Sequence, residues 1–230
     1  MKTIGLIGGL SWESTATYYK LMNRIAGDCL GGIHSARLLM WSFDFAEVAE
    51  LQAAGDWDRL HDLMIQAGRT LQDGGADALI ICTNTMHKCV DLMEEALYVP
   101  ILHICDVTAK AIWQQESRAP ILLGTRYTME QAFYRDRLAR NGVAVVVPEK
   151  DDRDEIHRII YDELCKGKIL PESKQAYLEI INRLAGKGAD GVILGCTEIG
   201  LLIGQEDLEL PVFDTTILHT TAAMDWALED

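Results

Sequence analysis

A repeat within the sequence constrains the fold more than any other feature. The segment GADALIICTNTMH, residues 75–87, matches GADGVILGCTEIG, residues 188–200, when it is shifted by 113 positions. Each copy is followed by an acidic helical stretch and by an apolar segment with a central proline, LYVPILHI and LELPVFDT. Upstream, IGLIGGLS at residues 4–11 matches PILLGTRY at residues 120–127. We therefore expect two similar halves, each built around its own sheet.

Short apolar runs alternate with segments that have helical spacing of apolar residues. The runs lack polar–apolar alternation, which is typical of parallel strands buried on both faces. We predict an α/β fold with two pseudo-symmetric, doubly wound parallel-sheet domains, because the repeat argues against a single eight-stranded barrel. The predicted strands lie at residues 3–9, 36–43, 77–83, 99–105, 119–125, 143–149, 191–196 and 210–215.

Helices are predicted between these strands. Examples lie at residues 12–28, 57–75, 128–142, 154–167 and 173–188. The C-terminal segment repeats elements that begin the second half, so it is expected to pack back onto the first domain. We therefore expect a first domain of residues 1–97 plus 210–230 and a second domain of residues 98–209.

Charge and composition exclude several classes of partner. The chain has 21 basic and 35 acidic residues and no basic cluster, so we expect no nucleic-acid partner. No apolar run reaches the roughly 18 residues of a membrane span, and the N-terminal run is too short for a signal peptide. We expect a cytoplasmic protein without membrane association. The six cysteines lack paired spacing and are expected to be free thiols.

Four turns follow predicted strands, where open parallel sheets bind ligands. They are Gly8–Ser11, Cys82–Thr85, Gly124–Thr128 and Gly195–Glu198. A pseudo-twofold arrangement would bring them around one cleft between the domains. The repeat aligns Thr83, not Cys82, with Cys196. Neighbours in an extended chain point to opposite faces, so we predict that Thr83 and Cys196 face the cleft and that Cys82 lies in the core.

The predicted cleft suits proton transfer at a carbon. Two acid–base groups on opposite sides of a substrate can remove a proton from one face and return one to the other. Polar side chains at helix N-termini would bind an α-carboxylate and stabilise an enediolate-like intermediate. No lysine adjoins these turns, which argues against a Schiff base. The candidate substrate-binding residues of this kind are Ser11, Asn84, Thr85, Thr125 and Thr197.

Four motifs in the same order resemble the aspartate/glutamate racemase family, and especially its enterobacterial amino-acid racemase branch. They are MKTIGLIGGLSWEST, CTNTMHK, LLGTRYTMEQ and GCTEIGLL, and the resemblance covers essentially the whole chain. It implies a cofactor-independent racemase with an active site between two α/β domains, an amino-acid substrate and a homodimer. The two catalytic thiols of the family fall here on Thr83 and Cys196, so the first thiol is missing.

The missing thiol makes the two faces of the predicted site unequal. A thiol with a pKa of about 8.5 can ionise near neutral pH when it has help, whereas a threonine hydroxyl cannot. By analogy with the family, Cys196 is the base that deprotonates the L-enantiomer. Thr83 relays a proton or caps the next helix. Glu198 and His87 follow the two motifs and could orient or deprotonate a thiol, although a structural role is favoured for His87.

The substrate side chain is left open between two classes. Aspartate-selective relatives carry a lysine in a motif that aligns with IYDELCKG, where this chain has Cys165 and places Lys166 one step later. The arginine that such relatives carry after the second strand is also missing. Either Lys166, Arg126 or Gln52 replaces these cations in binding aspartate or glutamate, or the substrate is neutral, such as homoserine.

Other functions were weighed against racemisation. Related one-thiol enzymes are decarboxylases, and the fold could also serve a non-catalytic amino-acid-binding protein. A metal site at Cys82, His87 and Cys89 is not expected, because the spacing is irregular and a fourth ligand is missing. GLIGG lacks the dinucleotide fingerprint, so no nucleotide cofactor is expected either.

Overall fold

The computed structural model describes residues 1–229 and divides into two compact units. The first comprises Met1–His103 with His219–Asp230, and the second comprises Ile104–Leu218. The chain enters the second unit after His103 and returns to the first after Leu218, and both boundaries lie later than the expected ones after residues 97 and 209. The second of these boundaries lies inside helix α10, Thr215–Leu228, which begins in the second unit and ends in the first. Within residues 1–229, no helix is long and apolar enough to span a bilayer.

The first unit contains a parallel sheet with the strand order β2-β1-β3. The segment around Ile101 extends this sheet through a single bridge to Leu79. The strands are β1 Ile4–Gly8, β2 Leu38–Ser42 and β3 Ala78–Ile81. The helices are α1 Trp12–Leu30, α2 Phe45–Ala54, α3 Trp57–Asp73, the 3-10 helix η1 Thr85–Cys89 and α4 Val90–Ala96.

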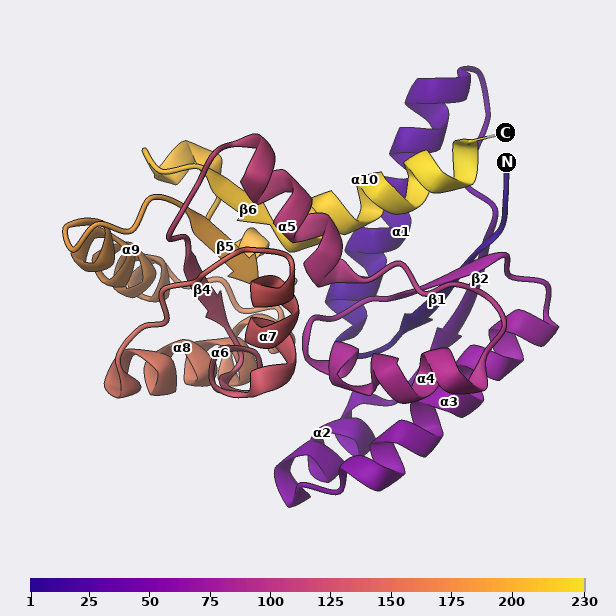
Figure 1. Ribbon diagram of the computed structural model, residues 1–230, viewed down its shortest axis with the longest axis horizontal. Helices are drawn as coiled ribbons and strands as arrows, with labels where there is room; N and C mark the ends of the chain where they lie inside the picture. Colours follow the sequence, from indigo (N-terminus) through magenta and orange to yellow (C-terminus); the bar gives the residue numbers. More distant parts are fainter. Residues whose placement is uncertain (230) are drawn as a thin grey trace. The chain divides into compact units, whose positions relative to one another are not determined.

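Side chains on both faces of the first sheet are buried, as expected for parallel strands. Ile7 and Ile81 pack with side chains of α3 and α4 on one face. Leu6 and Ile80 pack on the other face with α1 and with the C-terminal part of α10, which crosses α1 in Figure 1. Cys82 belongs to this second core and is fully buried, so the prediction that Cys82 lies in the core is confirmed.

The second unit has the same design, with the strand order β4-β5-β6. Helices α8 and α9 cover one face of this sheet, and α5 and α7 cover the other. The strands are β4 Ile121–Gly124, β5 Val192–Gly195 and β6 Val212–Asp214. The helices are α5 Ile104–Gln114, α6 Arg126–Glu130, α7 Ala132–Arg140, α8 Lys150–Asp162, η2 Leu164–Lys166, α9 Pro171–Ala185, η3 Ile199–Leu201 and η4 Gln205–Asp207.

Two predicted strands are reduced to single bridges in the structure. They are the segments 99–105 and 143–149, in which single bridges pair Ile101 with Leu79 and Val146 with Ile121. Each lies at the outer edge of its sheet, and a proline within each segment lacks the N–H that would extend a ladder. The prediction of full strands there was wrong.

Two predicted helices are shorter than expected. The helix at 128–142 is split at Gln131, whose φ of −82° and ψ of 150° are extended rather than helical. Helix α8 ends at Asp162, where Glu163 has φ −123° and ψ −69°, and Cys165 and Lys166 lie in η2. The sequence has no glycine or proline at either break, so pattern alone could not locate them.

Candidate active site

The first unit brings two predicted turns to one edge of its sheet. Strands β1 and β3 are parallel, so the turns that follow Gly8 and Ile81 lie at the same carboxyl edge. The chain can pass there only with a glycine at position 9. Gly9 has φ 71°, and a Cβ at this position would lie 2.2 Å from the carbonyl oxygen of Phe43.

Ser11 is the most unusual residue of this edge. Its backbone has φ 112°, a conformation that residues with a side chain rarely adopt. Its side chain is buried, and its Oγ has no hydrogen-bond partner among residues 1–229. A buried hydroxyl without a partner costs about 1–3 kcal/mol, and strained backbone is concentrated at ligand sites. Ser11 therefore has the properties of a hydroxyl held ready for a ligand.

A hydrogen bond from the side chain of His87 fixes the backbone of the Thr83 turn. Thr83 is half-buried, whereas Asn84 and Thr85 are buried. The Nδ1 atom of His87 lies 2.8 Å from the carbonyl oxygen of Thr83. A carbonyl only accepts, so His87 donates from Nδ1. The main chain of Thr83 is thus fixed by a buried imidazole one helical turn away.

Gln52 also lies beside this motif. It is 4% exposed, and its Nε2 donates to the sulfur of Met86 at 3.2 Å. The sequence offered Gln52 as a substitute for a missing cation, and the structure places it against the first motif, in the unit that contains Thr83.

In the second unit, two glycines bring two more turns together. Gly124 of β4 pairs with Gly195 of β5. A Cβ on Gly124 would lie 2.7 Å from the carbonyl oxygen of Gly195. The absence of side chains lets the strand ends approach, so Thr125 and Cys196 follow adjacent strands at one edge. Thr125 also caps α6, because its Oγ1 accepts from the N–H of Thr128 at 3.3 Å.

Cys196 forms a buried hydrogen-bonded group with its two following residues. Its Sγ donates to Oε2 of Glu198 at 2.9 Å, and the Oγ1 of Thr197 donates to the same oxygen at 2.9 Å. All three residues are buried. Burial, and then the charge of Glu198, raise the pKa of the Cys196 thiol well above its usual value. In the unliganded protein Cys196 is therefore a thiol, and the adjoining carboxylate is positioned to take its proton.

Cys165 and Lys166 differ in their surroundings. Cys165 is half-buried, and its pKa is raised by burial and then by the charge of Glu198. Lys166 is exposed, and its Nζ lies 3.2 Å from Oδ1 of Asp162. Cys165 is thus close enough to Glu198 for the carboxylate charge to affect its thiol, whereas the ammonium of Lys166 lies at the surface. Arg126, the other candidate cation, is also exposed and pairs with an aspartate at 3.0 Å.

Two polar residues at strand ends were missed by sequence reasoning. His103 is 6% exposed and follows the bridged segment of the first sheet. Asp214 ends β6, and its Oδ1 accepts from the N–H of Thr216 at 2.8 Å. Burial raises the pKa of Asp214 despite hydrogen bonds that lower it. The sequence carried a signal for both residues, because they occupy the same next-to-last position in the two proline-containing segments of the repeat.

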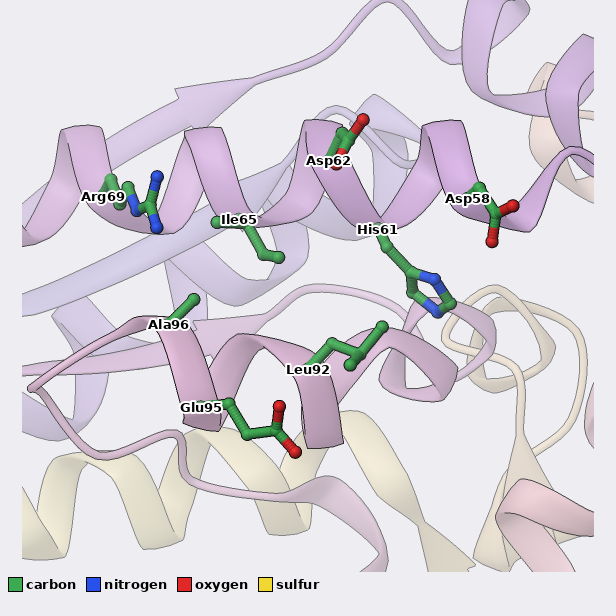
Figure 2. A pocket seen from close by; sticks show the side chains of 8 residues that line it. All are labelled: Asp58, His61, Asp62, Ile65, Arg69, Leu92, Glu95 and Ala96. Carbon is green, nitrogen blue, oxygen red and sulfur yellow. The ribbon is translucent and has the colours of Figure 1, made fainter.

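A cavity of about 500 Å³ lies on the first unit, between α3 and α4 (Figure 2). Its lining includes none of the predicted site residues. It is lined by Asp58, His61, Asp62, Ile65, Arg69, Leu92, Glu95 and Ala96. Within residues 1–229, no group of three or more histidine, cysteine or acidic side chains is arranged to hold a metal ion.

Two α/β units, each a parallel sheet with a polar motif at its carboxyl edge, define the class of the protein. It is a two-unit α/β protein of the kind found among amino-acid racemases. A glutamate racemase from Francisella tularensis, solved with D-glutamate, shares this fold at 14% identity with a TM-score of 0.70. That similarity covers 98% of this chain and 80% of the other.

Closer relatives identify the family. The sequence model of the Asp/Glu/hydantoin racemase family matches residues 7–223, so the chain belongs to this family and is an isomerase of the racemase type. A candidate Asp/Glu racemase from Yersinia pestis is 49% identical over the full length of both chains, with a TM-score of 0.92. An aspartate racemase homologue from Pyrococcus horikoshii is 34% identical over the full length of both chains, with a TM-score of 0.86. The broad specificity amino-acid racemase RacX of Bacillus subtilis is 27% identical over 162 residues, 70% of this chain and 69% of that protein.

Proposed function

We propose that this protein is a cofactor-independent amino-acid racemase in which Cys196 removes the α-hydrogen of the L-enantiomer. Thr83 lies on the opposite face of the α-carbon in this proposal. The observation that carries it is the 2.9 Å hydrogen bond from the Cys196 thiol to the Glu198 carboxylate. A buried thiol bonded to a buried carboxylate has a built-in acceptor for its proton.

The first step follows from this pair. Glu198 takes the proton of Cys196, which leaves a thiolate and a neutral carboxyl group. The pair carries one negative charge before and after this step, so the α-ammonium of a bound amino acid favours the step when it lies closer to the sulfur than to the carboxylate. The thiolate then removes the α-hydrogen as a proton, so the C–H bond breaks and an S–H bond forms.

The carbanion needs hydrogen-bond donors around its carboxylate. Hydroxyl groups and backbone N–H groups at the starts of η1, α6 and η3 supply them in this proposal. The unpartnered hydroxyl of Ser11 is the clearest support, because a substrate oxygen would satisfy it. The proposed substrate-binding residues are Ser11, Gln52, Asn84, Thr85, Thr125, Cys165 and Thr197, and Lys166 joins them only if it leaves its surface ion pair to bind an acidic side chain.

Aspartate and glutamate are the first substrates to test. The family carries their names, and the P. horikoshii relative is described as an aspartate racemase homologue. A neutral amino acid such as homoserine is the second candidate. It is favoured by the surface ion pair of Lys166 and by the closeness of Cys165 to the charge of Glu198, since a distal carboxylate there would meet a like charge.

We also propose that the enzyme acts as a homodimer in the cytoplasm, as the family resemblance implies. Light scattering coupled to size-exclusion chromatography measures the first point. A mass near 25.6 kDa, that of one chain, would contradict it.

The test of the proposed function is α-hydrogen exchange in D₂O, followed by proton NMR for a panel of L-amino acids. We expect wash-out from at least one acidic or neutral substrate, and its loss in Cys196→Ala. Cys29→Ala is the matched control, because Cys29 is exposed and remote in sequence from both motifs. Unchanged wash-out in Cys196→Ala would refute the proposal. Release of carbon dioxide from a disubstituted malonate, without wash-out, would indicate the decarboxylase instead.

A further inference from the structure

His157 of α8 contacts the backbone of the turn that begins α6. Its Nδ1 atom lies 3.2 Å from the backbone nitrogen of Arg126, the first residue of α6. The first N–H groups of a helix have no acceptor within that helix, so this N–H needs an acceptor from elsewhere. A backbone N–H only donates, so Nδ1 of His157 is the acceptor and carries no proton. His157 is therefore a neutral imidazole with its hydrogen on Nε2.

The turn that His157 contacts contains Thr125, one of the proposed substrate-binding residues. Thr125 is buried and caps α6 through the N–H of Thr128. Helix α8 holds the same turn a second time, because Asp154 accepts from the guanidinium of Arg126 at 3.0 Å. The His157 contact differs from this exposed ion pair because it fixes the main chain directly after Thr125. The conformation of the Thr125 turn thus depends on an acceptor that α8 supplies.

The imidazole also packs against a residue that lies near Cys196. The ring centroids of His157 and Tyr161 lie 4.7 Å apart. Burial, and then the charges of neighbouring groups that include Cys196 and Glu198, raise the pKa of the Tyr161 hydroxyl. Tyr161 is therefore close enough to the Cys196 group for their charges to affect it. His157 thus contacts both the Thr125 turn and the surroundings of the proposed base.

Protonation of Nδ1 would remove the acceptor and place one N–H group against another. Burial, and then the charge of Arg126, lower the pKa of His157 below its ordinary value of 6.5, so the neutral form predominates at neutral pH. The carboxylates near the ring act in the opposite direction. The charged and titratable groups around the ring are Arg126, Tyr127 and Glu130 of α6 and Asp154, Tyr161 and Asp162 of α8.

We propose that His157 is a positioning residue that, as a neutral acceptor, holds the Thr125 turn in the conformation that binds the substrate carboxylate. Protonation of Nδ1 breaks the hydrogen bond to Arg126 and releases the turn. This inference rests on the proposed racemase function, because Thr125 binds a carboxylate only there. Acid should therefore weaken substrate binding through His157 and leave proton transfer at Cys196 unchanged. The effect belongs in KM and not in kcat.

The kinetic test compares His157→Asn with His157→Leu, two side chains of similar size that both lack the ring. The amide oxygen of asparagine can replace Nδ1 as acceptor without titrating, whereas leucine has no acceptor. We measure kcat and KM for α-hydrogen wash-out from L-aspartate and from L-homoserine by proton NMR. At pH 7.5, His157→Leu should raise KM about fivefold, the usual worth of one hydrogen bond, and change kcat less than about twofold. His157→Asn should restore KM to within about twofold of the wild type.

The pH profile separates titration of His157 from other effects of acid. As the pH falls from 8 to 5, the wild-type KM should rise towards that of His157→Leu, whereas the KM of His157→Asn should stay constant. His34→Leu, at an exposed histidine, is the matched control. Equal KM values in the two His157 variants would overturn the inference. An acid rise in KM that His157→Asn retains would overturn it too.

A measurement without substrate separates this inference from the proposed function. In protein labelled with ¹⁵N-arginine, the amide signal of Arg126 is the one that disappears in Arg126→Lys. Its proton shift should titrate between pH 7.5 and 5 in the wild type and not in His157→Asn. Asp154 does not titrate in this range, because its hydrogen bond to Lys150 lowers its pKa below the ordinary value. An Arg126 amide that does not respond to pH, or responds equally in His157→Asn, would overturn the inference even in an active racemase. Absence of wash-out from every amino acid, with the amide titration intact, would instead refute the proposed function.

Discussion

Protonation of His219 should make the first unit sensitive to acid. In the folded protein, burial lowers the pKa of His219 from 6.5 to about 4, although its hydrogen bond to the carbonyl of Leu102 opposes this shift. The unfolded chain therefore binds one more proton than the folded chain between these two values, so stability falls as the pH falls. The stabilisation is fully present above pH 6.5 and is lost as the pH decreases to about 4.

The magnitude follows from the two pKa values. Each pH unit is worth about 1.4 kcal/mol, so the interval from 6.5 to about 4 corresponds to about 3 kcal/mol. That is a large share of the 5–15 kcal/mol that stabilises a typical domain. Protonation also places a charge against Tyr18 and against the ring of His87, at 5.6 Å, in a fully buried location.

The assay compares urea unfolding of the wild type and of His219→Gln at several pH values between 7 and 4.5. Glutamine can donate to Leu102 and accept from Tyr18 without titrating, so the variant should lose the slope of about 1.4 kcal/mol per pH unit. Tryptophan fluorescence reports mainly on the first unit, which holds four of the five tryptophans. His34→Gln is the control. A stability difference between wild type and His219→Gln that stays constant over this pH range would refute the reasoning.

Three further changes test the site. Glu198→Gln should slow wash-out from the L-enantiomer about 100-fold, because the Cys196 thiol loses its proton acceptor. Proton NMR in D₂O measures this rate, and an unchanged rate would contradict the role of Glu198 as proton acceptor. Gly124→Ala should lower both kcat, measured as the steady-state racemisation rate, and Tm, measured by thermal unfolding, because its Cβ would meet the carbonyl oxygen of Gly195 at 2.7 Å and displace the strand end before Cys196; unchanged values would contradict this close approach. Lys166→Ala should leave kcat/KM for L-aspartate within about threefold, since exposed ion pairs contribute little; a tenfold rise in KM would assign the distal carboxylate to this lysine.

The α/β class and the doubled design were predictable because they depend on local pattern. Buried parallel strands need apolar residues on both faces, and the repeat marks where each unit begins again. The edge segments were not predictable to the same degree. Ile101 and Val146 lie in runs that look like strands. How far such a run pairs depends on the strand beside it, and the sequence alone does not show which strand that is.

The site shows the same division. The thiol of Cys196 and the hydroxyl of Thr83 could be selected from motif spacing. His103 could not, because a histidine at the end of an apolar run has no periodicity that separates a core role from a site role. The ring centroids of His103 and His87 lie 4.7 Å apart because the segment that contains His103 pairs with Leu79 of β3. Contacts of this kind depend on the order of the strands and on their register. A single sequence gives no information on the register.

The asymmetry of the two motifs has a thermodynamic limit. Racemisation has an equilibrium constant of one, so kcat/KM must be the same from L to D and from D to L, however unequal the two faces are. A hydroxyl on one face and a thiol on the other, as proposed for Thr83 and Cys196, can therefore differ only in exchange rates, in kcat and in KM taken separately. A change at Cys196 must lower kcat/KM equally in both directions, while the proposed one-base mechanism predicts that it slows wash-out mainly from the L-enantiomer. The two turns would thus be distinguished by isotope exchange, and not by the direction in which the enzyme converts its substrate.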